Sequence, residues 1–159
     1  MKYSVAMTDG VAAEIDPLAL ESQVCFALAV TNRAVLAVYR PLLEPLGLTH
    51  PQYLVMLALW DNAKGAGEPL SVKDIARLLQ MDSATLSPML KRLQAQGRIT
   101  RVELAPKGRS LRRQALEVPP SVVERLGVEL SELEHLRDAL TSINTAALAA
   151  GALDSELDR

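Results

Sequence analysis

The sequence predicts a mostly α-helical protein with one small β-hairpin, arranged as a winged helix-turn-helix. Three observations support this fold class. The 159-residue chain is 49% apolar but only 3% aromatic, so Leu, Ala and Val dominate, and Leu and Ala favour helices. Two short amphipathic segments in the middle of the chain are joined by a tight turn. A basic segment with the alternation of a hairpin follows them. The length fits one soluble domain or one subunit of an oligomer.

The first part of the chain predicts a long helix. Asp16-Pro17 reads as an N-cap and a first-turn proline, and apolar residues then keep helical spacing to about Tyr39. Residues 1–16 are expected to form a flexible tail, and they lack the apolar run of a signal peptide. Pro41 and Pro45 flank a short helix ending at Gly47. Thr49-His50-Pro51 then predicts the start of the next helix.

The middle of the chain predicts a helix-turn-helix. Ser71 and Asp74 have the spacing of a capping box, followed by a short helix over 72–79. Asp82 is the expected cap of a second helix, over 83–96, which Pro88 should bend. Hydroxyl and basic side chains outside the core of this second helix are predicted to contact DNA. They are Ser83, Thr85, Ser87, Lys91 and Arg92.

A wing is expected directly after this motif. Alternation over 99–104 predicts one strand, residues 105–108 a turn, and residues 109–116 a returning strand. A basic tip of this length would reach a minor groove. Its predicted DNA-binding residues are Lys107, Arg109, Arg112 and Arg113.

Charge is distributed unevenly along the chain. The net charge is −2, but residues 66–114 contain ten Lys or Arg and four Asp or Glu, giving +6, which leaves −8 elsewhere. A basic lobe on an acidic scaffold is typical of a DNA-binding protein, although a basic stretch can also be an ordinary solvated surface.

The C-terminal part predicts two further helices, over 121–126 and from Leu130 to about Ala150, after Pro119-Pro120. Leu and Ile recur on one side of the last helix and need a packing partner. We therefore expect a symmetric dimer that presents two recognition helices to a palindromic operator in double-stranded DNA. The predicted organisation is a tail (1–16), N-terminal dimerisation helices (17–47), a DNA-binding lobe (48–116) and C-terminal dimerisation helices (117–159).

Several classes of function lack support in the sequence. One Cys and two His make no credible zinc set, and neither a phosphate-binding loop nor a hydrolase nucleophile motif occurs. We expect no metal, no cofactor and no enzymatic activity. No run of about 18 uncharged apolar residues occurs, so we expect no contact with a membrane and a cytoplasmic location.

The order of these elements resembles the MarR family of bacterial transcription regulators, and in particular its organic-hydroperoxide-sensing branch, the OhrR-like repressors. The resemblance covers roughly residues 20–113. It is carried by L-E-S-Q-V-C-F-A-L (20–28), Y-R-P-L-L (39–43), L-T-H-P-Q-Y-L (48–54) with Leu59-Trp60, and D-S-A-T-L-S-P-M-L-K-R-L (82–93).

The resemblance implies that Cys25 is a redox sensor. In that branch a hydroperoxide oxidises the matching thiolate to sulfenic acid, and phenols of the partner subunit hydrogen-bond the sulfur. Tyr39 matches one of these phenols. His50 stands where the branch has another tyrosine, and an imidazole can also donate to a thiolate. Lys107 stands where family wings often have an acid two residues before the tip arginine.

The expected function is a homodimeric repressor that releases its operator when an organic hydroperoxide oxidises Cys25, which then forms a mixed disulfide with a small cellular thiol. Three alternatives remain open at this point. The input can be a small aromatic or phenolic ligand in the dimer crevice, with Cys25 only structural. The chain can be a thiol peroxidase, or an adaptor that has lost DNA binding.

Overall fold

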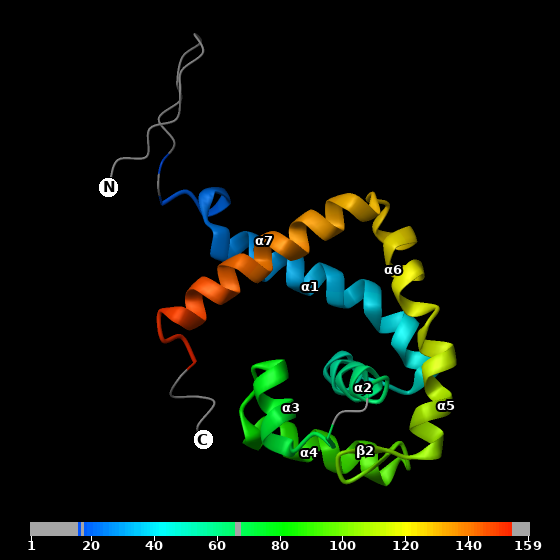
Figure 1. Ribbon diagram of the computed structural model, residues 1–159. Coiled ribbons are helices and arrows are strands. Elements are labelled where there is room, and N and C mark those ends of the chain that lie inside the picture. Colours follow the sequence, from blue (N-terminus) through cyan, green and yellow to red (C-terminus); the bar gives the residue numbers. More distant parts are fainter. Residues whose placement is uncertain (1–15, 17, 66–67, 154–159) are drawn as a thin grey trace. The chain divides into compact units, whose positions relative to one another are not determined.

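A computed structural model describes residues 16, 18–65 and 68–153 (Figure 1). The chain divides into two compact units, residues 1–35 and 36–159. The predicted tail, residues 1–16, lies outside the described residues except for Asp16. Pro17 lies outside them too. The elements follow in this order: η1 (Leu20–Ser22), α1 (Val24–Leu43), η2 (Glu44–Leu46), α2 (His50–Asn62), α3 (Val72–Leu79), α4 (Ser83–Ala95), β1 (Ile99–Thr100), β2 (Glu103–Leu104), α5 (Pro106–Ala115), α6 (Val118–Leu126) and α7 (Leu130–Ala149).

Helix α1 differs from the predicted first helix at both ends. Asp16 accepts a hydrogen bond from the Leu18 backbone N–H (2.9 Å), but this closes only a turn, because the extended backbone of Gln23 separates η1 from α1. At the other end α1 continues through Pro41 to Leu43. Proline removes a single backbone donor there, in the last turn, and the side chain of Leu43 is anchored in the core.

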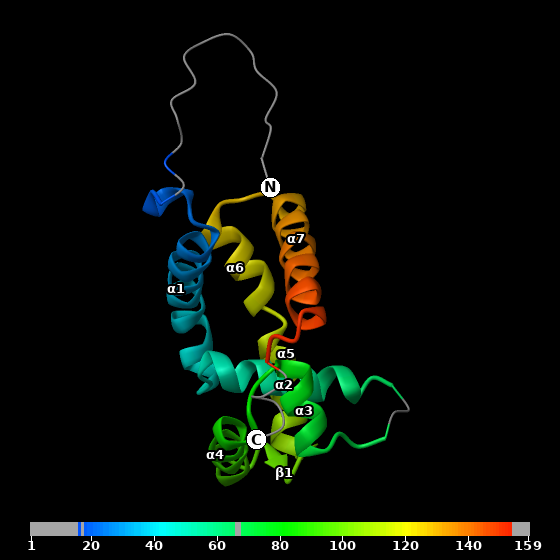
Figure 2. The same ribbon diagram turned by 90° about the vertical axis from the view of Figure 1, so that its left-hand side faces the viewer.

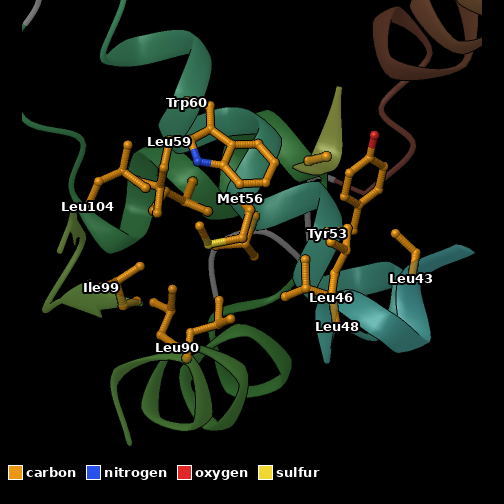
Figure 3. Packing of buried hydrophobic residues seen from close by; sticks show 14 of the residues in the cluster. Leu43, Leu46, Leu48, Tyr53, Met56, Leu59, Trp60, Leu90, Ile99 and Leu104 are labelled. Atoms are coloured by element: carbon orange, nitrogen blue, oxygen red, sulfur yellow. The ribbon is translucent and has the colours of Figure 1, made fainter. Parts of the chain in front are cut away.

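Helix α2 is the centre of the second unit. Thr49 and Gln52 form a capping box that begins the helix at His50, as the sequence predicts. Its buried residues include Tyr53, Met56 and Trp60 (Figure 3). Figure 2 shows α3, α4 and the strands beside α2. The helix-turn-helix and the hairpin therefore both pack against α2.

The helix-turn-helix is confirmed. Ser71 and Asp74 cap α3 reciprocally, with the Ser71 N–H donating to Asp74 at 2.8 Å and the Asp74 N–H donating to Ser71 Oγ at 3.1 Å. Gln80, at φ 50°, ends α3 in the left-handed conformation. Helix α4 begins after Asp82 and buries Leu86, Leu90 and Leu93.

The wing is much shorter than predicted. Ile99 pairs with Leu104 and Thr100 with Glu103, so the segment expected to be one strand is a complete hairpin. The expected second strand, residues 109–116, is instead part of α5. The reason lies in the spacing of small and apolar residues: Gly108, Leu111 and Ala115 line one face of a helix, and Pro106 occupies its first turn, a position that proline favours.

A close backbone contact holds α5 against the base of the hairpin. A Cβ atom at Gly108 would overlap the carbonyl oxygen of Arg98, so only glycine fits this approach. The indole N–H of Trp60 donates to the Gly108 carbonyl at 2.9 Å. Helix α2, the hairpin and α5 are thereby joined at one point.

The last two helices follow the prediction closely. Pro119 and Pro120 lie in the first turn of α6, which begins slightly earlier than expected, and Gly127 at φ 64° separates α6 from α7. None of the residues of α7 is buried. Leu136, Leu140 and Ile143, on one side of it, are 37–52% exposed. Such a stripe of apolar side chains calls for a covering partner.

Helix α1 and the turn after it, Val24–Leu46, are long and apolar enough to cross a membrane. The sequence prediction counted only uncharged residues, and Arg33 and Arg40 interrupt this stretch. Length and mean hydropathy do not distinguish a membrane span from a helix of a soluble protein that packs against another helix.

Candidate functional site

Side-chain hydrogen bonds organise the polar N-terminus of α4. Asp82 accepts hydrogen bonds from the backbone N–H and the hydroxyl of Thr85, both at 2.7 Å, and these bonds lower the pKa of its carboxyl group. The Ser87 hydroxyl donates to the carbonyl of Ser83 at 2.7 Å. Two of the predicted DNA-contacting hydroxyls thus donate within the helix, which leaves their oxygen lone pairs as acceptors.

Helix α4 exposes three of its five predicted DNA contacts fully: Thr85, Lys91 and Arg92. Ser83 and Ser87 are half-buried. Two further residues of α4, Ala84 and Pro88, are exposed, although sequence reasoning did not select them as DNA contacts. Ala84 and Pro88 are four residues apart, and Lys91 comes three residues after Pro88. This spacing places the three residues on one face of the helix. Small apolar groups on such a face suit contacts with thymine methyl groups.

The four predicted wing cations do not lie on the hairpin. Lys107, Arg109, Arg112 and Arg113 all belong to α5, so the inferred correspondence between Lys107 and the acid of a family wing is wrong. Arg101 occupies the hairpin turn instead. It is exposed and has a φ of 60°. Sequence reasoning missed it because the predicted strand ran through Arg101, from 99 to 104, whereas β1 ends at Thr100.

Three aromatic residues gather where α1 meets α2. The rings of Tyr39 and His50 lie edge to face with centroids 5.1 Å apart, and the Tyr53 ring is 6.1 Å from Tyr39. Burial raises the pKa of both phenols, with the neighbouring Tyr39 adding to the effect at Tyr53, and burial lowers the pKa of His50. At neutral pH the cluster therefore consists of protonated phenols and a neutral imidazole, all of which can donate hydrogen bonds.

Cys25, the third predicted sensor residue, lies on α1 within the first unit and is exposed. It is the single cysteine of the chain. Tyr39 and His50 belong to the second unit, where their rings are in contact. Cys25 belongs to the first unit, and its position is described only within that unit.

An open pocket of about 770 Å³ lies beside α2. Leu57, Leu79 and Trp60 contribute apolar surface. Arg112 contributes positive charge, while Lys64 is paired with Asp61, which also lines the pocket, at 3.2 Å. This pocket is formed within one chain and does not need a dimer crevice.

Comparisons with known proteins identify the family. The model of the MarR family matches residues 46–110, which include α2, the helix-turn-helix and the hairpin. The organic hydroperoxide resistance transcriptional regulator of Bacillus subtilis (strain 168) is 35% identical, over 82% of this chain and 92% of its own length. The chain belongs to the MarR family. It is thus a winged-helix transcriptional regulator, as the sequence predicts.

Further relatives and solved structures match over similar lengths of the chain. The transcriptional regulator TtmR of Methylorubrum extorquens (strain PA1) is 40% identical over 80% of this chain and 69% of its own length. The crystal structure of AbfR of Staphylococcus epidermidis matches with a TM-score of 0.64 at 27% identity, covering 82% of this chain and 93% of AbfR. A structure of reduced AbfR bound to DNA matches with a TM-score of 0.59 at 25% identity, over 81% and 94% of the two chains.

Proposed function

We propose that this chain is a homodimeric repressor that releases its operator when an organic hydroperoxide oxidises Cys25. One observation carries the proposal. The single cysteine is exposed on the first long helix of a chain that is 35% identical to an organic hydroperoxide resistance regulator. AbfR, whose reduced form has been seen on DNA, supports a link between redox state and DNA binding. A DNA-binding regulator of this kind acts in the cytoplasm.

The exposed apolar side chains support the dimer. Leu136, Leu140 and Ile143 are exposed on α7, and Val24 and Leu28 are exposed on the first unit. A monomer rarely leaves such stripes in water, whereas a two-fold symmetric interface covers both at once. The same symmetry sets the two copies of α4 on half-sites about one helical turn of DNA apart.

The oxidation step is a two-electron transfer from sulfur to the peroxide. The Cys25 thiolate attacks one peroxide oxygen, a sulfur–oxygen bond forms, and the oxygen–oxygen bond breaks. The alkoxide leaves and takes up a proton to become an alcohol, and Cys25 becomes a sulfenic acid. A small thiol then displaces water from the sulfenic acid and forms a mixed disulfide, and a second thiol restores the reduced cysteine.

Tyr39 and His50 are the proposed donors to the sulfur. Tyr39 comes fourteen residues after Cys25 in the sequence. In the branch that the chain resembles, the phenol bonded to the sulfur comes from the partner subunit, and we assign that role to Tyr39 of the second subunit. The edge-to-face contact with His50 fixes the orientation of the Tyr39 ring, and the neutral imidazole offers another donor beside it.

A DNA-binding titration tests the proposal. Wild-type protein and Cys25→Ser are titrated onto the duplex upstream of the gene, before and after exposure to cumene hydroperoxide, with excess dithiothreitol added last. We expect wild type to lose affinity on oxidation and to regain it on reduction, while Cys25→Ser stays bound throughout. Equal release of both proteins would show that Cys25 does not sense the oxidant. Catalytic turnover of peroxide would favour a peroxidase instead.

The pocket beside α2 favours a second candidate function, a repressor that responds to a small aromatic carboxylate. Its apolar walls suit an aromatic ring, and Arg112 offers a bidentate partner for a carboxylate. Trp60 is the only tryptophan and lines this pocket, so its fluorescence reports binding directly. Saturable quenching by salicylate that Arg112→Gln weakens would support this function, and unchanged fluorescence at millimolar salicylate would exclude it for this ligand.

A further inference from the structure

The hairpin between α4 and α5 has very little length outside the core. Each strand has two residues, and the inner pair, Ile99 and Leu104, is buried at 2% and 8% exposure. The Ala105 N–H donates to the Arg98 carbonyl at 3.0 Å and closes the base. The part that projects is therefore one residue pair, Thr100 and Glu103, with the turn between them.

The backbone of such an arm is too short to enter a minor groove. A strand rises about 3.3 Å per residue, so one projecting pair extends only a few ångströms beyond the core. The minor groove is about 7.5 Å deep and lies beyond the phosphate backbone that borders the major groove. If α4 lies in the major groove, the backbone of the turn would come level with the bordering phosphates, and the Arg101 side chain would be the group that contacts them.

The residue at the turn suits a phosphate contact. Arg101 has a φ of 60°, a left-handed conformation that glycine or asparagine adopts at lower cost than arginine. It is exposed, and neither of the ion pairs found among the described residues involves it. A planar guanidinium binds a phosphate through paired hydrogen bonds. Backbone strain of this kind concentrates at functional sites, which supports a binding role for Arg101.

We propose that this regulator reads its operator from the major groove alone, through α4, and that Arg101 clamps a bordering phosphate without reading sequence. The inference rests on the proposed DNA-binding function and specifies how the site works. The wing contributes affinity and orientation, and specificity comes from the exposed face that includes Thr85, Pro88 and Lys91.

Modified bases separate the two grooves. A duplex selected by the full-length protein from a random pool is remade with inosine for guanine, which removes only a minor-groove amino group, or with 7-deazapurines, which remove a major-groove acceptor. We expect inosine to change the Kd less than twofold, and 7-deazapurines within the half-sites to weaken binding about tenfold or more. A tenfold effect of inosine beside the half-sites would overturn the proposal.

Arginine variants test the clamp. Arg101→Gln and Arg101→Gly should weaken binding to all duplexes by a similar factor and reduce the slope of log Kd against log salt by about one. The glycine variant relieves the strained turn, so lost binding cannot be ascribed to unfolding. Arg125→Gln, an exposed substitution on α6, should leave the slope unchanged. A changed base preference in either Arg101 variant would overturn the proposal. Wild-type protein that selects no duplex would overturn DNA binding itself.

Discussion

His50 is a half-buried titratable residue at the start of α2, in edge-to-face contact with Tyr39. Burial lowers its pKa below the ordinary value of 6.5. Between the lowered pKa of the folded state and 6.5, the unfolded chain binds more protons than the folded one. Stability should therefore be complete above about pH 6.5 and should fall as the pH decreases through that window.

Replacing His50 should flatten this pH dependence. We expect the Tm of His50→Gln to change less between pH 7.5 and pH 5.5 than that of wild type. His135→Gln is the matched control, because His135 is exposed on α7 and has no such burial. An unchanged pH profile in His50→Gln, or a flattened one in His135→Gln, would show that His50 does not carry the effect.

Arg98 is a buried cation with too few partners. Its Nη2 donates to the Leu46 carbonyl at 2.6 Å, but its Nε and Nη1 are buried and have no hydrogen-bond partner among the described residues. Burial also lowers the pKa of this guanidinium. A buried charge with unsatisfied donors costs stability. The one hydrogen bond that the side chain makes links η2 to the base of the hairpin.

Two substitutions of Arg98 should have opposite effects. Arg98→Met keeps the packing volume and removes the unsatisfied donors, so we expect the free energy of unfolding to rise by about 1 kcal/mol. Arg98→Lys keeps a strongly hydrated charge in the same buried place, so we expect the free energy of unfolding of this variant to fall. Urea unfolding measures both. The reverse order would mean that the guanidinium is fully paired in solution.

At the scale of elements, the capping residues made the helix starts predictable. Thr49, Ser71 and Asp82 each cap a helix that begins within one residue of the expected place. The predictions failed where a wing of ordinary length was assumed. Gly108, Leu111 and Ala115 have the spacing of a helix. Residues 109–116 were nevertheless predicted as a strand, because a wing needs a second strand. Local signals determine the start of an element better than assumed topology determines its type.

The junction of the hairpin with α5 should be far less tolerant than the end of α4. A methyl group at Gly108 would overlap the Arg98 carbonyl, so Gly108→Ala must separate α5 from the hairpin, at a cost of about 3 kcal/mol. Gly97 also has a positive φ, 70°, but nothing lies near its added Cβ. Gly97→Ala should cost only the backbone strain, about 1–2 kcal/mol. Equal losses in urea unfolding would contradict this packing.

For the whole molecule, the sequence predicted the DNA-binding lobe better than the sensor. The exposed residues of α4 follow from periodicity and a cap within one chain. The roles of Cys25, Tyr39 and His50 came only from a family resemblance, because a hydrogen bond between single side chains of two subunits, unlike an apolar stripe, leaves no periodic pattern in the sequence. The Tyr39–His50 contact is present in the structure, and their bond to the thiol stays a prediction.

The exposed stripe on α7 provides a test of the dimer that leaves the DNA-binding lobe intact. Ile143 is 52% exposed and lies in line with Leu136 and Leu140, so Ile143→Glu should place a charge in the interface and give monomers in sedimentation equilibrium at micromolar concentration. Ser142→Glu, off the stripe, should remain dimeric.

DNA binding should also differ between the monomeric and the dimeric variant. Two linked half-site contacts bind about 100-fold or more tightly than one, so Ile143→Glu should lose at least that factor on a palindromic duplex and bind a single half-site as wild type does. A monomeric variant with full affinity for the palindrome would show that α7 does not join the two DNA-binding lobes. Equal loss on both duplexes would mean that the substitution damages the lobe itself, since an intact lobe recognises its half-site without a partner.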